Sequence, residues 1–377
     1  MPKAADLAVP IRVTVLTGFL GAGKTTLLNR LLADPAVTDT AVIVNEFGEA
    51  GIDHLLVETA RDGVIELSDG CLCCTVRGDL VDTLADLADR VQTGRLPPLK
   101  RVVVETTGLA DPTPILAALM GHPALLQAYA LDGVVAVLDA LSGPQNLGER
   151  EEARRQVAVA DRIVVSKTDL AGPDALAALT ALIRPINPGA PILDAAKGEA
   201  VPSALLDCGL YDPATKTADV ARWLRDEVLH DAHDHHHPGH DHAAHGPSAP
   251  SRHGAIRSFS IQHAPPLPTA QVEAFLDLLR EMQGEKILRM KAIVRTVEHP
   301  GRPLVLHGVR SHLHPPARLP AWPADCLPGS RLVLIGEELD ERLVRDLFAA
   351  FAGQPRLDAP DRQALTDNPL AVPGMSF

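Results

Sequence analysis

Residues 17–32 read TGFLGAGKTTLLNRLL and follow the apolar run IRVTVL of residues 11–16. The stretch has the spacing of a phosphate-binding loop: a glycine, four further residues, and then Gly23-Lys24-Thr25. The apolar run before the loop predicts a strand, and the leucines after it predict a helix with one apolar face. The sequence therefore predicts the strand, loop and helix that open a P-loop nucleotide-binding fold.

Each residue type in this loop has a chemical reason to be there. Glycines let backbone N–H groups turn toward phosphate oxygens, Lys24 places an ammonium on the β- and γ-phosphates, and the hydroxyl of Thr25 can ligate Mg²⁺. We expect Lys24 and Thr25 to serve catalysis as well as binding. The loop residues expected to contact the nucleotide are Gly18, Gly21, Gly23, Lys24, Thr25 and Thr26.

The chain divides at a histidine-rich segment. Before it, short β-branched runs such as RVVVE and DRIVVSK alternate with helical stretches, which predicts an α/β fold with helices on both faces of a parallel sheet. Residues 230–253 hold nine of the sixteen histidines and are too polar to form a core. The predicted divisions are 1–228 for the P-loop domain, 229–255 for a His-rich linker, 256–357 for a smaller α+β domain and 358–377 for a tail.

The segment SKTD, residues 166–169, predicts which base is bound. A carboxylate at Asp169 can accept both N–H donors of guanine, whereas adenine offers no such pair, and Lys167 can lay its aliphatic stem on the purine. GTPases more commonly have Asn where this chain has Ser166, so we expect this departure to affect nucleotide affinity rather than base choice. Residues 194–198, DAAKG, are expected to form a second loop beside the base.

The segment VVVETTG, residues 102–108, predicts how the γ-phosphate is handled. It reads as a buried strand that ends in an acid and a glycine. Glu105 can orient a Mg²⁺-bound or attacking water, which is a catalytic role, and the N–H of Gly108 can contact the γ-phosphate. Together with the loop and SKTD, this segment predicts binding and hydrolysis of GTP with Mg²⁺.

The segment GCLCC, residues 70–74, brings three potential thiolates together. Zn²⁺ takes four tetrahedral ligands, and a single cluster leaves positions for a carboxylate, a histidine or water, which suits an exchangeable ion better than a structural one. A redox pair or buried inert thiols are the alternatives. The cysteines are Cys71, Cys73 and Cys74, and the preceding segment of residues 45–54 offers Glu46, Glu49 and His54.

Composition excludes several classes of partner. With 35 Lys and Arg against 48 Asp and Glu, the net charge is −13, which opposes nonspecific binding to nucleic acid or anionic membrane. The chain begins without a basic region followed by an apolar stretch and has no run of eighteen apolar residues, so we expect a cytoplasmic protein. Outside the motifs, we expect packing or surface roles for Cys208, Cys326, His307, His312 and His314.

These segments together resemble the CobW-type family of P-loop GTPases, which includes zinc metallochaperones. The resemblance spans residues 11 to about 355 and rests on GFLGAGKTTLLNRLL, VNEFGEAGID, GCLCCTVRGDL, ETTGLADP and SKTD. It is specific because a CxCC between the VNEFGEAGID segment and the ETTG strand is not a general GTPase feature. It implies a GTP-hydrolysing chaperone that binds Zn²⁺, or Co²⁺ in cobalamin-linked members, and passes it to a client metalloprotein.

By position, the three cysteines match the metal-binding motif of the family, and the resemblance implies that Glu46 is the carboxylate near the metal. A cobalt-handling GTPase, a metalloenzyme activator and a His-rich storage protein remain alternatives, because thiolate and imidazole suit several divalent ions. The histidines of residues 230–253 fit either a metal buffer or a solvated linker. The client and the oligomeric state stay open, a homo-oligomer included.

Overall fold

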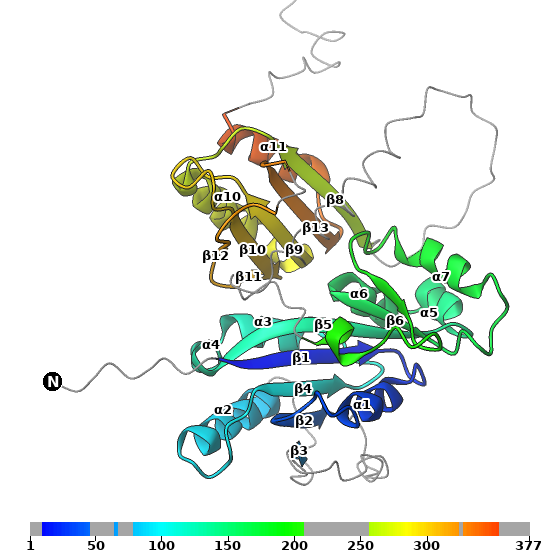
Figure 1. Ribbon diagram of the computed structural model, residues 1–377. Coiled ribbons are helices and arrows are strands. Elements are labelled where there is room, and N and C mark those ends of the chain that lie inside the picture. The colour runs from blue at the N-terminus through cyan, green and yellow to red at the C-terminus, as the bar shows by residue number, and fades with distance from the viewer. Residues whose placement is uncertain (1–9, 46–63, 67–77, 207–255, 324–326, 354–377) are drawn as a thin grey trace, which may run out of the picture.

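The computed structural model describes residues 10–45, 64–66, 78–206, 256–323 and 327–353 (Figure 1). Within these residues the chain forms a seven-stranded sheet before residue 195 and a six-stranded sheet after residue 255. The predicted α/β fold followed by an α+β domain is confirmed. No helix in the part of the chain that the structure describes has the length and apolarity needed to cross a bilayer.

The first sheet is parallel throughout, in the order β3-β2-β4-β1-β5-β6-β7. Its carboxyl ends therefore meet at one edge, where open α/β sheets bind ligands. The short strand β3 is an addition to the strands that the sequence predicted. The strands are β1 Ile11–Gly18, β2 Thr40–Asn45, β3 Val64–Glu66, β4 Arg101–Thr106, β5 Tyr129–Asp139, β6 Arg162–Ser166 and β7 Ile192–Asp194.

Helices cover both faces of this sheet. The predicted apolar stripe of α1, which includes Leu28 and Leu31, is buried against one face with Leu16 of β1. Alternate residues of the same strand, Val13 and Val15, point into a second core beneath α2, α3, α6 and α7. The helices are α1 Lys24–Leu32, α2 Gly78–Gln92, α3 Thr113–Gly121, α4 Pro123–Ala128, α5 Gly143–Glu149, α6 Glu151–Val159, α7 Ala175–Ile183 and α8 Pro202–Leu205.

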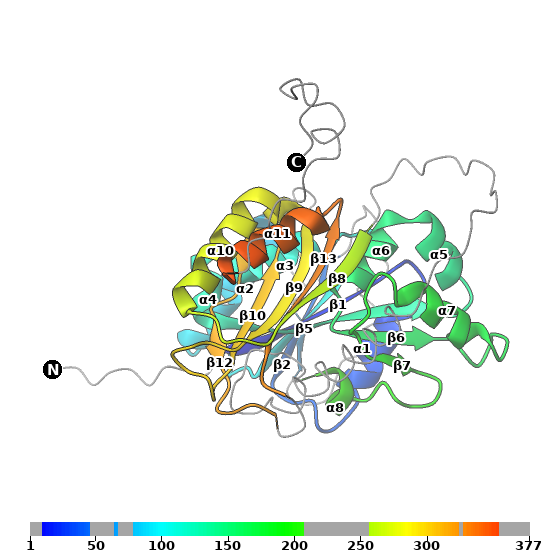
Figure 2. The same cartoon turned by 90° about the horizontal axis from the view of Figure 1, so that it is seen from above.

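The second sheet is antiparallel, in the order β11-β10-β9-β13-β8, with β12 paired to β10. Helices α10 and α11 lie across its outer face (Figure 2). Its inner face contacts α3 and α6 of the first domain. Its elements are β8 Ile256–His263, α10 Thr269–Gln283, η2 Gly284–Lys286, β9 Ile287–Val294, β10 Leu304–Val309, β11 His312–Leu313, β12 Ala317–Arg318, β13 Ser330–Glu337 and α11 Glu341–Phe351.

A buried carboxylate at the start of β6 fixes the two domains together. Asp161 accepts hydrogen bonds from Arg289 Nη2 at 2.7 and 2.9 Å, and its Oδ1 lies 2.6 Å from Lys291 Nζ. The side chains of Asp161 and Arg289 are only 6% and 3% exposed. Burial raises the pKa of Asp161, but Arg289 and Lys291 outweigh it and hold the pKa well below its ordinary value.

We expect Asp161→Ala to lower the free energy of unfolding by about 3–5 kcal/mol at pH 7, because it leaves two cations at a buried interface without their carboxylate. Because the folded pKa is depressed, this stabilisation is fully present above the unfolded pKa of about 3.9 and is lost as the pH falls through the folded value. Urea unfolding of both proteins at pH 7 and pH 5 should therefore give the same difference.

The matched control is Asp277→Ala, which removes a carboxylate 75% exposed beside Arg280. An exposed pair of this kind contributes at most about 1 kcal/mol. Equal losses of stability in the two variants would show that the Asp161 cluster is not a structural link between the domains.

Candidate functional site

The phosphate loop is shaped by glycines with left-handed backbones. Gly18, Gly21 and Gly23 have φ angles of 142°, 72° and 95°. A Cβ at Gly18 would lie 2.2 Å from the carbonyl oxygen of Val137, so only glycine allows β1 to end against β5 here. The chain then turns directly into α1, and the first N–H groups of a helix have no partner within the helix itself.

Lys24 and Thr25 begin α1 and point in different directions. The ammonium of Lys24 donates to the carbonyl oxygens of Gly18 at 3.0 Å and Phe19 at 3.4 Å, so it lies over the loop. The hydroxyl of Thr25 donates to Oε1 of Glu105 at 2.8 Å, which joins the loop to the end of β4. A hydroxyl beside a carboxylate supplies the oxygen ligands that Mg²⁺ prefers.

The glycine of ETTG lies against the phosphate loop itself. A Cβ at Gly108 would lie 2.5 Å from the backbone nitrogen of Leu20 and 2.7 Å from its Cα. No other residue fits this close approach without moving the loop. The structure therefore brings together three predicted parts of the site: the loop, Glu105 and Gly108. Thr26, also predicted, is on the exposed side of α1.

The loop after β6 is tied to the phosphate loop by two side chains. Ser166 Oγ donates to the carbonyl oxygen of Ala22 at 2.7 Å. Lys167, with a left-handed φ of 58°, donates from Nζ to the carbonyl oxygen of Gly21 at 2.9 Å. Ser166, which sequence reasoning treated only as a departure from Asn, thus holds the two loops together.

Asp139 at the end of β5 is a residue that sequence reasoning missed. It is 6% exposed and accepts hydrogen bonds from the N–H groups of Leu141 at 2.6 Å and Ser142 at 3.0 Å. Its Oδ2 lies 2.7 Å from Lys167 Nζ. Burial raises the pKa of Asp139, but the bonds from Lys167 and Ser142 outweigh it and lower the pKa. Its position, an acid ending a strand beside β1, was the available signal.

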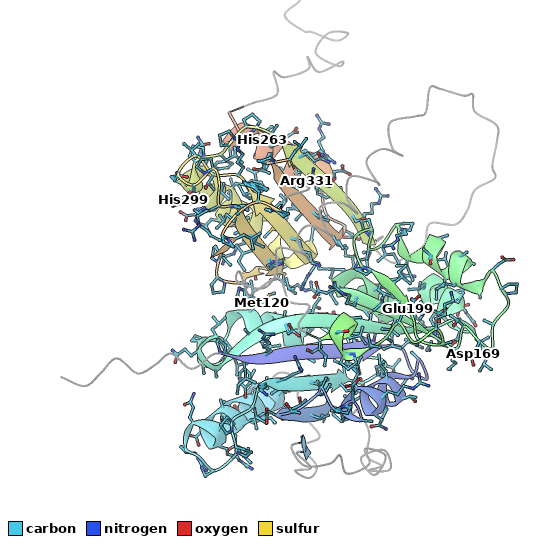
Figure 3. The ribbon with its side chains drawn as sticks, in the orientation of Figure 1. Met120, Asp169, Glu199, His263, His299 and Arg331 are labelled. Atoms are coloured by element: carbon cyan, nitrogen blue, oxygen red, sulfur yellow. The ribbon has the colours of Figure 1, made fainter. Side chains whose placement is uncertain are left out.

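Asp169 is exposed and lies at the outer edge of this domain, on the same side as Glu199 (Figure 3). The predicted second loop, residues 194–198, lies beside SKTD, because Thr168 Oγ1 donates to Asp194 Oδ1 at 2.5 Å. The same oxygen accepts the N–H of Ala196 at 3.0 Å. SKTD and DAAKG are therefore neighbours at the carboxyl ends of β6 and β7, as expected.

The predicted metal ligands Glu46, Cys71, Cys73 and Cys74 lie outside the described residues, as do residues 230–253, Cys208 and Cys326. Among the residues that are described, no three His, Cys, Asp or Glu side chains are grouped so that they could hold a metal ion. His307 is 3% exposed and burial lowers its pKa well below the ordinary value, so it has a structural position. His312 and His314 are partly buried.

The phosphate loop, the acid at the end of β4 and the loop after β6 define a P-loop nucleotide-binding protein. The family described as CobW/HypB/UreG, nucleotide-binding domain, matches residues 12–194, and the Cobalamin synthesis protein cobW C-terminal domain matches residues 256–352. The chain belongs to this CobW family of P-loop GTPases.

Similar proteins cover both domains. The zinc chaperone YjiA of Escherichia coli is 33% identical over 91% of this chain and 98% of its own length. The zinc chaperone CobW of Pseudomonas aeruginosa is 32% identical over 94% of each chain. The crystal structure of Zn(II)-bound YjiA GTPase from E. coli superposes with a TM-score of 0.61 at 29% identity, covering 91% of this chain and 99% of that one.

We expect Asp139→Asn to weaken GTP binding about tenfold, because a neutral amide replaces the carboxylate in a charge-assisted hydrogen bond to Lys167. Titration with a fluorescent GTP analogue measures this affinity. Ser142→Ala is the matched control, since it removes one hydrogen bond to Asp139 and leaves the bond to Lys167. An unchanged affinity in Asp139→Asn would mean that this carboxylate does not position Lys167 for binding.

Proposed function

We propose that this protein is a GTP-hydrolysing metallochaperone that binds Zn²⁺ at Cys71, Cys73 and Cys74 and transfers it to a client metalloprotein, with the nucleotide state controlling the metal. One observation carries the proposal. Strand β2 ends at Asn45, which pairs with Thr106, the residue after Glu105. The segment that begins with Glu46 therefore starts at the edge of the sheet that holds the nucleotide loops.

The second metal-ligand segment follows β3, which runs parallel to β2. Strand β3 ends at Glu66, whose register partner is Val42 of β2, and the CxCC motif follows it in sequence. The names of the similar proteins support zinc as the ion, since YjiA and CobW are zinc chaperones. A relative in Schizosaccharomyces pombe, 34% identical over 54% of this chain, is a zinc-regulated GTPase metalloprotein activator, which supports a client protein. Thiolates with a carboxylate also suit Co²⁺.

The geometry supports a division of work in GTP hydrolysis. Lys24 and the glycine N–H groups bind the phosphates, and Gly108 offers its N–H to the γ-phosphate. Thr25 and Glu105 would hold Mg²⁺, which neutralises charge on the phosphate oxygens. Because Glu105 bonds directly to Thr25, it is better placed to orient a Mg²⁺-bound water than a distant one.

Base recognition is assigned to the two loops at the ends of β6 and β7. Lys167 lays its stem on the purine while its ammonium holds the phosphate loop and Asp139. Asp169 accepts the two N–H donors of guanine. Thr168, which bonds to Asp194, keeps SKTD and DAAKG on either side of the base.

We expect Asp169→Asn to move the preference from GTP toward xanthosine triphosphate, because an amide can donate to the carbonyl that xanthine carries in place of the guanine amino group. Competition of GTP, ATP and xanthosine triphosphate against one labelled nucleotide gives the three affinities. The control is Asp174→Asn, which removes an exposed carboxylate directly before α7 and outside SKTD. Equal binding of ATP and GTP by the unaltered protein would contradict the assignment of Asp169.

We expect the affinity for Zn²⁺ to differ about fivefold or more between the GTP-bound and GDP-bound protein. The γ-phosphate and Mg²⁺ order switch segments, and the segment carrying Glu46 starts at the sheet edge that holds the nucleotide loops. By linkage, Zn²⁺ must change the affinity for nucleotide by the same factor. A competitive Zn²⁺ titration with GDP and with a nonhydrolysable GTP analogue measures this difference.

Two variants make the titration specific. Cys73→Ser should remove tight Zn²⁺ binding in both nucleotide states, whereas Cys208→Ser should leave it unchanged. Identical Zn²⁺ affinity with GDP and with the analogue would show that the two sites are independent, and nucleotide control of the metal would have to be given up.

A further inference from the structure

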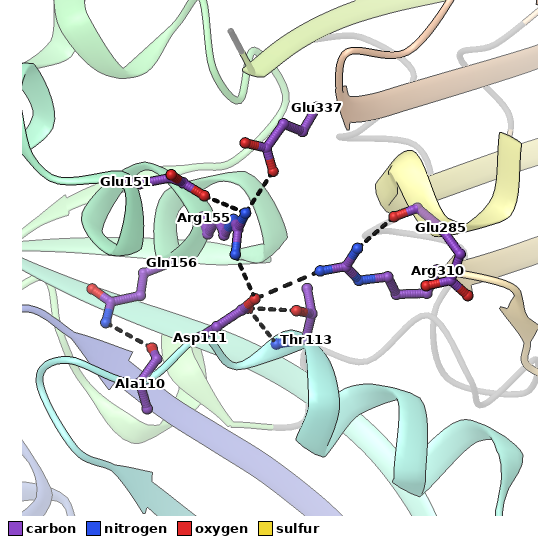
Figure 4. A network of polar contacts seen from close by, with 9 residues as sticks. All are labelled: Ala110, Asp111, Thr113, Glu151, Arg155, Gln156, Glu285, Arg310 and Glu337. Atoms are coloured by element: carbon purple, nitrogen blue, oxygen red, sulfur yellow. Dashed lines mark hydrogen bonds and ion pairs between the residues drawn. The ribbon is translucent and has the colours of Figure 1, made fainter. Parts of the chain in front are cut away.

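Helix α6 holds the segment that follows β4 from two sides (Figure 4). Gln156, which is 1% exposed, donates from Nε2 to the carbonyl oxygens of Gly108 at 3.2 Å and Ala110 at 3.1 Å. The preceding residue, Arg155, places Nη1 3.2 Å from Oδ2 of Asp111. Two consecutive residues of α6 therefore hold both the backbone and the acidic side chain of residues 108–111.

The same arginine reaches into the C-terminal domain. Arg155 Nη2 lies 2.7 Å from Oε2 of Glu337 at the end of β13, and it also pairs with Glu151. Figure 4 shows Arg155 between Asp111 of one domain and Glu337 of the other. A displacement of Asp111 therefore changes the charges around Arg155, which in turn changes the environment of Glu337.

A second contact between the domains is made by an arginine of the C-terminal domain. Arg310, in the turn between β10 and β11, lies with Nη2 3.7 Å from Oδ2 of Asp111 and donates from Nη1 to the carbonyl oxygen of Glu285. Its φ of 55° is left-handed, a conformation that a non-glycine residue keeps only when its surroundings hold it there. Asp111 is thus held by one arginine from each domain.

The ion pairs around Asp111 are partly exposed to solvent, so they can exchange partners at low cost. The side chains of Arg155, Asp111, Glu337 and Arg310 are between 19% and 26% exposed, so water reaches them and their pairs are exchangeable. The Asp161 cluster, by contrast, is almost fully buried, and breaking it would leave charges without partners. The two links between the domains therefore differ in how easily they can change.

We propose that Asp111, Arg155 and Glu337 relay the nucleotide state from the phosphate loop to the C-terminal domain, with Arg155 as a positioning residue for the segment 108–111. The proposal rests on the proposed function in one respect, the contact of Gly108 with the γ-phosphate. Gly108 touches Leu20 of the loop, and a movement there pulls on the groups that Gln156 and Arg155 hold. Linkage makes the relay reciprocal, so the C-terminal domain also acts on bound GTP.

Hydrogen exchange of the full chain, with Mg²⁺ and without Zn²⁺, tests the relay. Exchange is compared between GDP and a nonhydrolysable GTP analogue in wild type, Glu337→Gln and Lys291→Gln. Lys291→Gln is the matched control because it also weakens a link between the domains but leaves Asp161 paired with Arg289. In wild type we expect the analogue to change exchange in residues 106–112 and in residues 308–312 and 335–339.

In Glu337→Gln the change at 335–339 should be lost, while the changes at 106–112 and at 308–312, which Arg310 links to Asp111 directly, should persist. Lys291→Gln should behave like wild type. The ratio of the affinities for the GTP analogue and for GDP should change in Glu337→Gln and keep its wild-type value in Lys291→Gln. A wild-type change confined to 106–112, or the same behaviour in both variants, would overturn the relay alone. No change at 106–112 would overturn the assigned role of Gly108 together with the relay, and neither result depends on metal binding.

Discussion

The carbonyl oxygen of Val137 occupies the place where any side chain of Gly18 would begin. This close approach sets β1 against β5 and fixes where the phosphate loop leaves the sheet. Gly108 makes a second approach of the same kind, onto the backbone of Leu20. Because both contacts join backbone to backbone, the distance between the loop and the end of β4 is set by main-chain geometry. Glu105 then meets Thr25 without any long side chain having to span a gap.

Carboxylates at or near the strand ends position the segments of the site by side-chain hydrogen bonds, in addition to the backbone contacts of the glycines. Asp139 and Asp194 end β5 and β7, and Glu105 is the last residue but one of β4. Glu105 accepts a hydrogen bond from Thr25 at the start of α1, whereas Asp139 and Asp194 accept from Lys167 and Thr168 in the loop after β6. Each bond joins residues that are far apart in sequence, so the loops are oriented with respect to one another before a nucleotide arrives. Such preorganisation lowers the cost of ordering the site when the ligand binds.

Local spacing was enough to predict the phosphate loop, the apolar stripe of α1 and the order of the nucleotide segments. The bond from Ser166 to Ala22, the role of Asp139 and the link from Arg155 to Glu337 could not be predicted in this way. They join residues up to 182 positions apart, and no periodicity or motif records which side chains the folded topology brings together. Strand β3 has only three residues, too few for a pattern to be visible. The predicted metal ligands stay predictions, since they lie outside the described residues.

The two links between the domains also differ in where they lie on the first sheet. Asp161 precedes β6 and so belongs to its amino end, whereas Asp111 follows β4 at the carboxyl end, where the nucleotide loops gather. The buried cluster resists opening because its charges would lose their partners, and the half-buried pairs at the other end resist much less. The domains are therefore joined more firmly at the amino end of the first sheet, at Asp161, than at the carboxyl end, at Asp111. Helix α6 connects the two links, because it contacts β8, β9 and β13, carries Arg155 and ends two residues before Asp161.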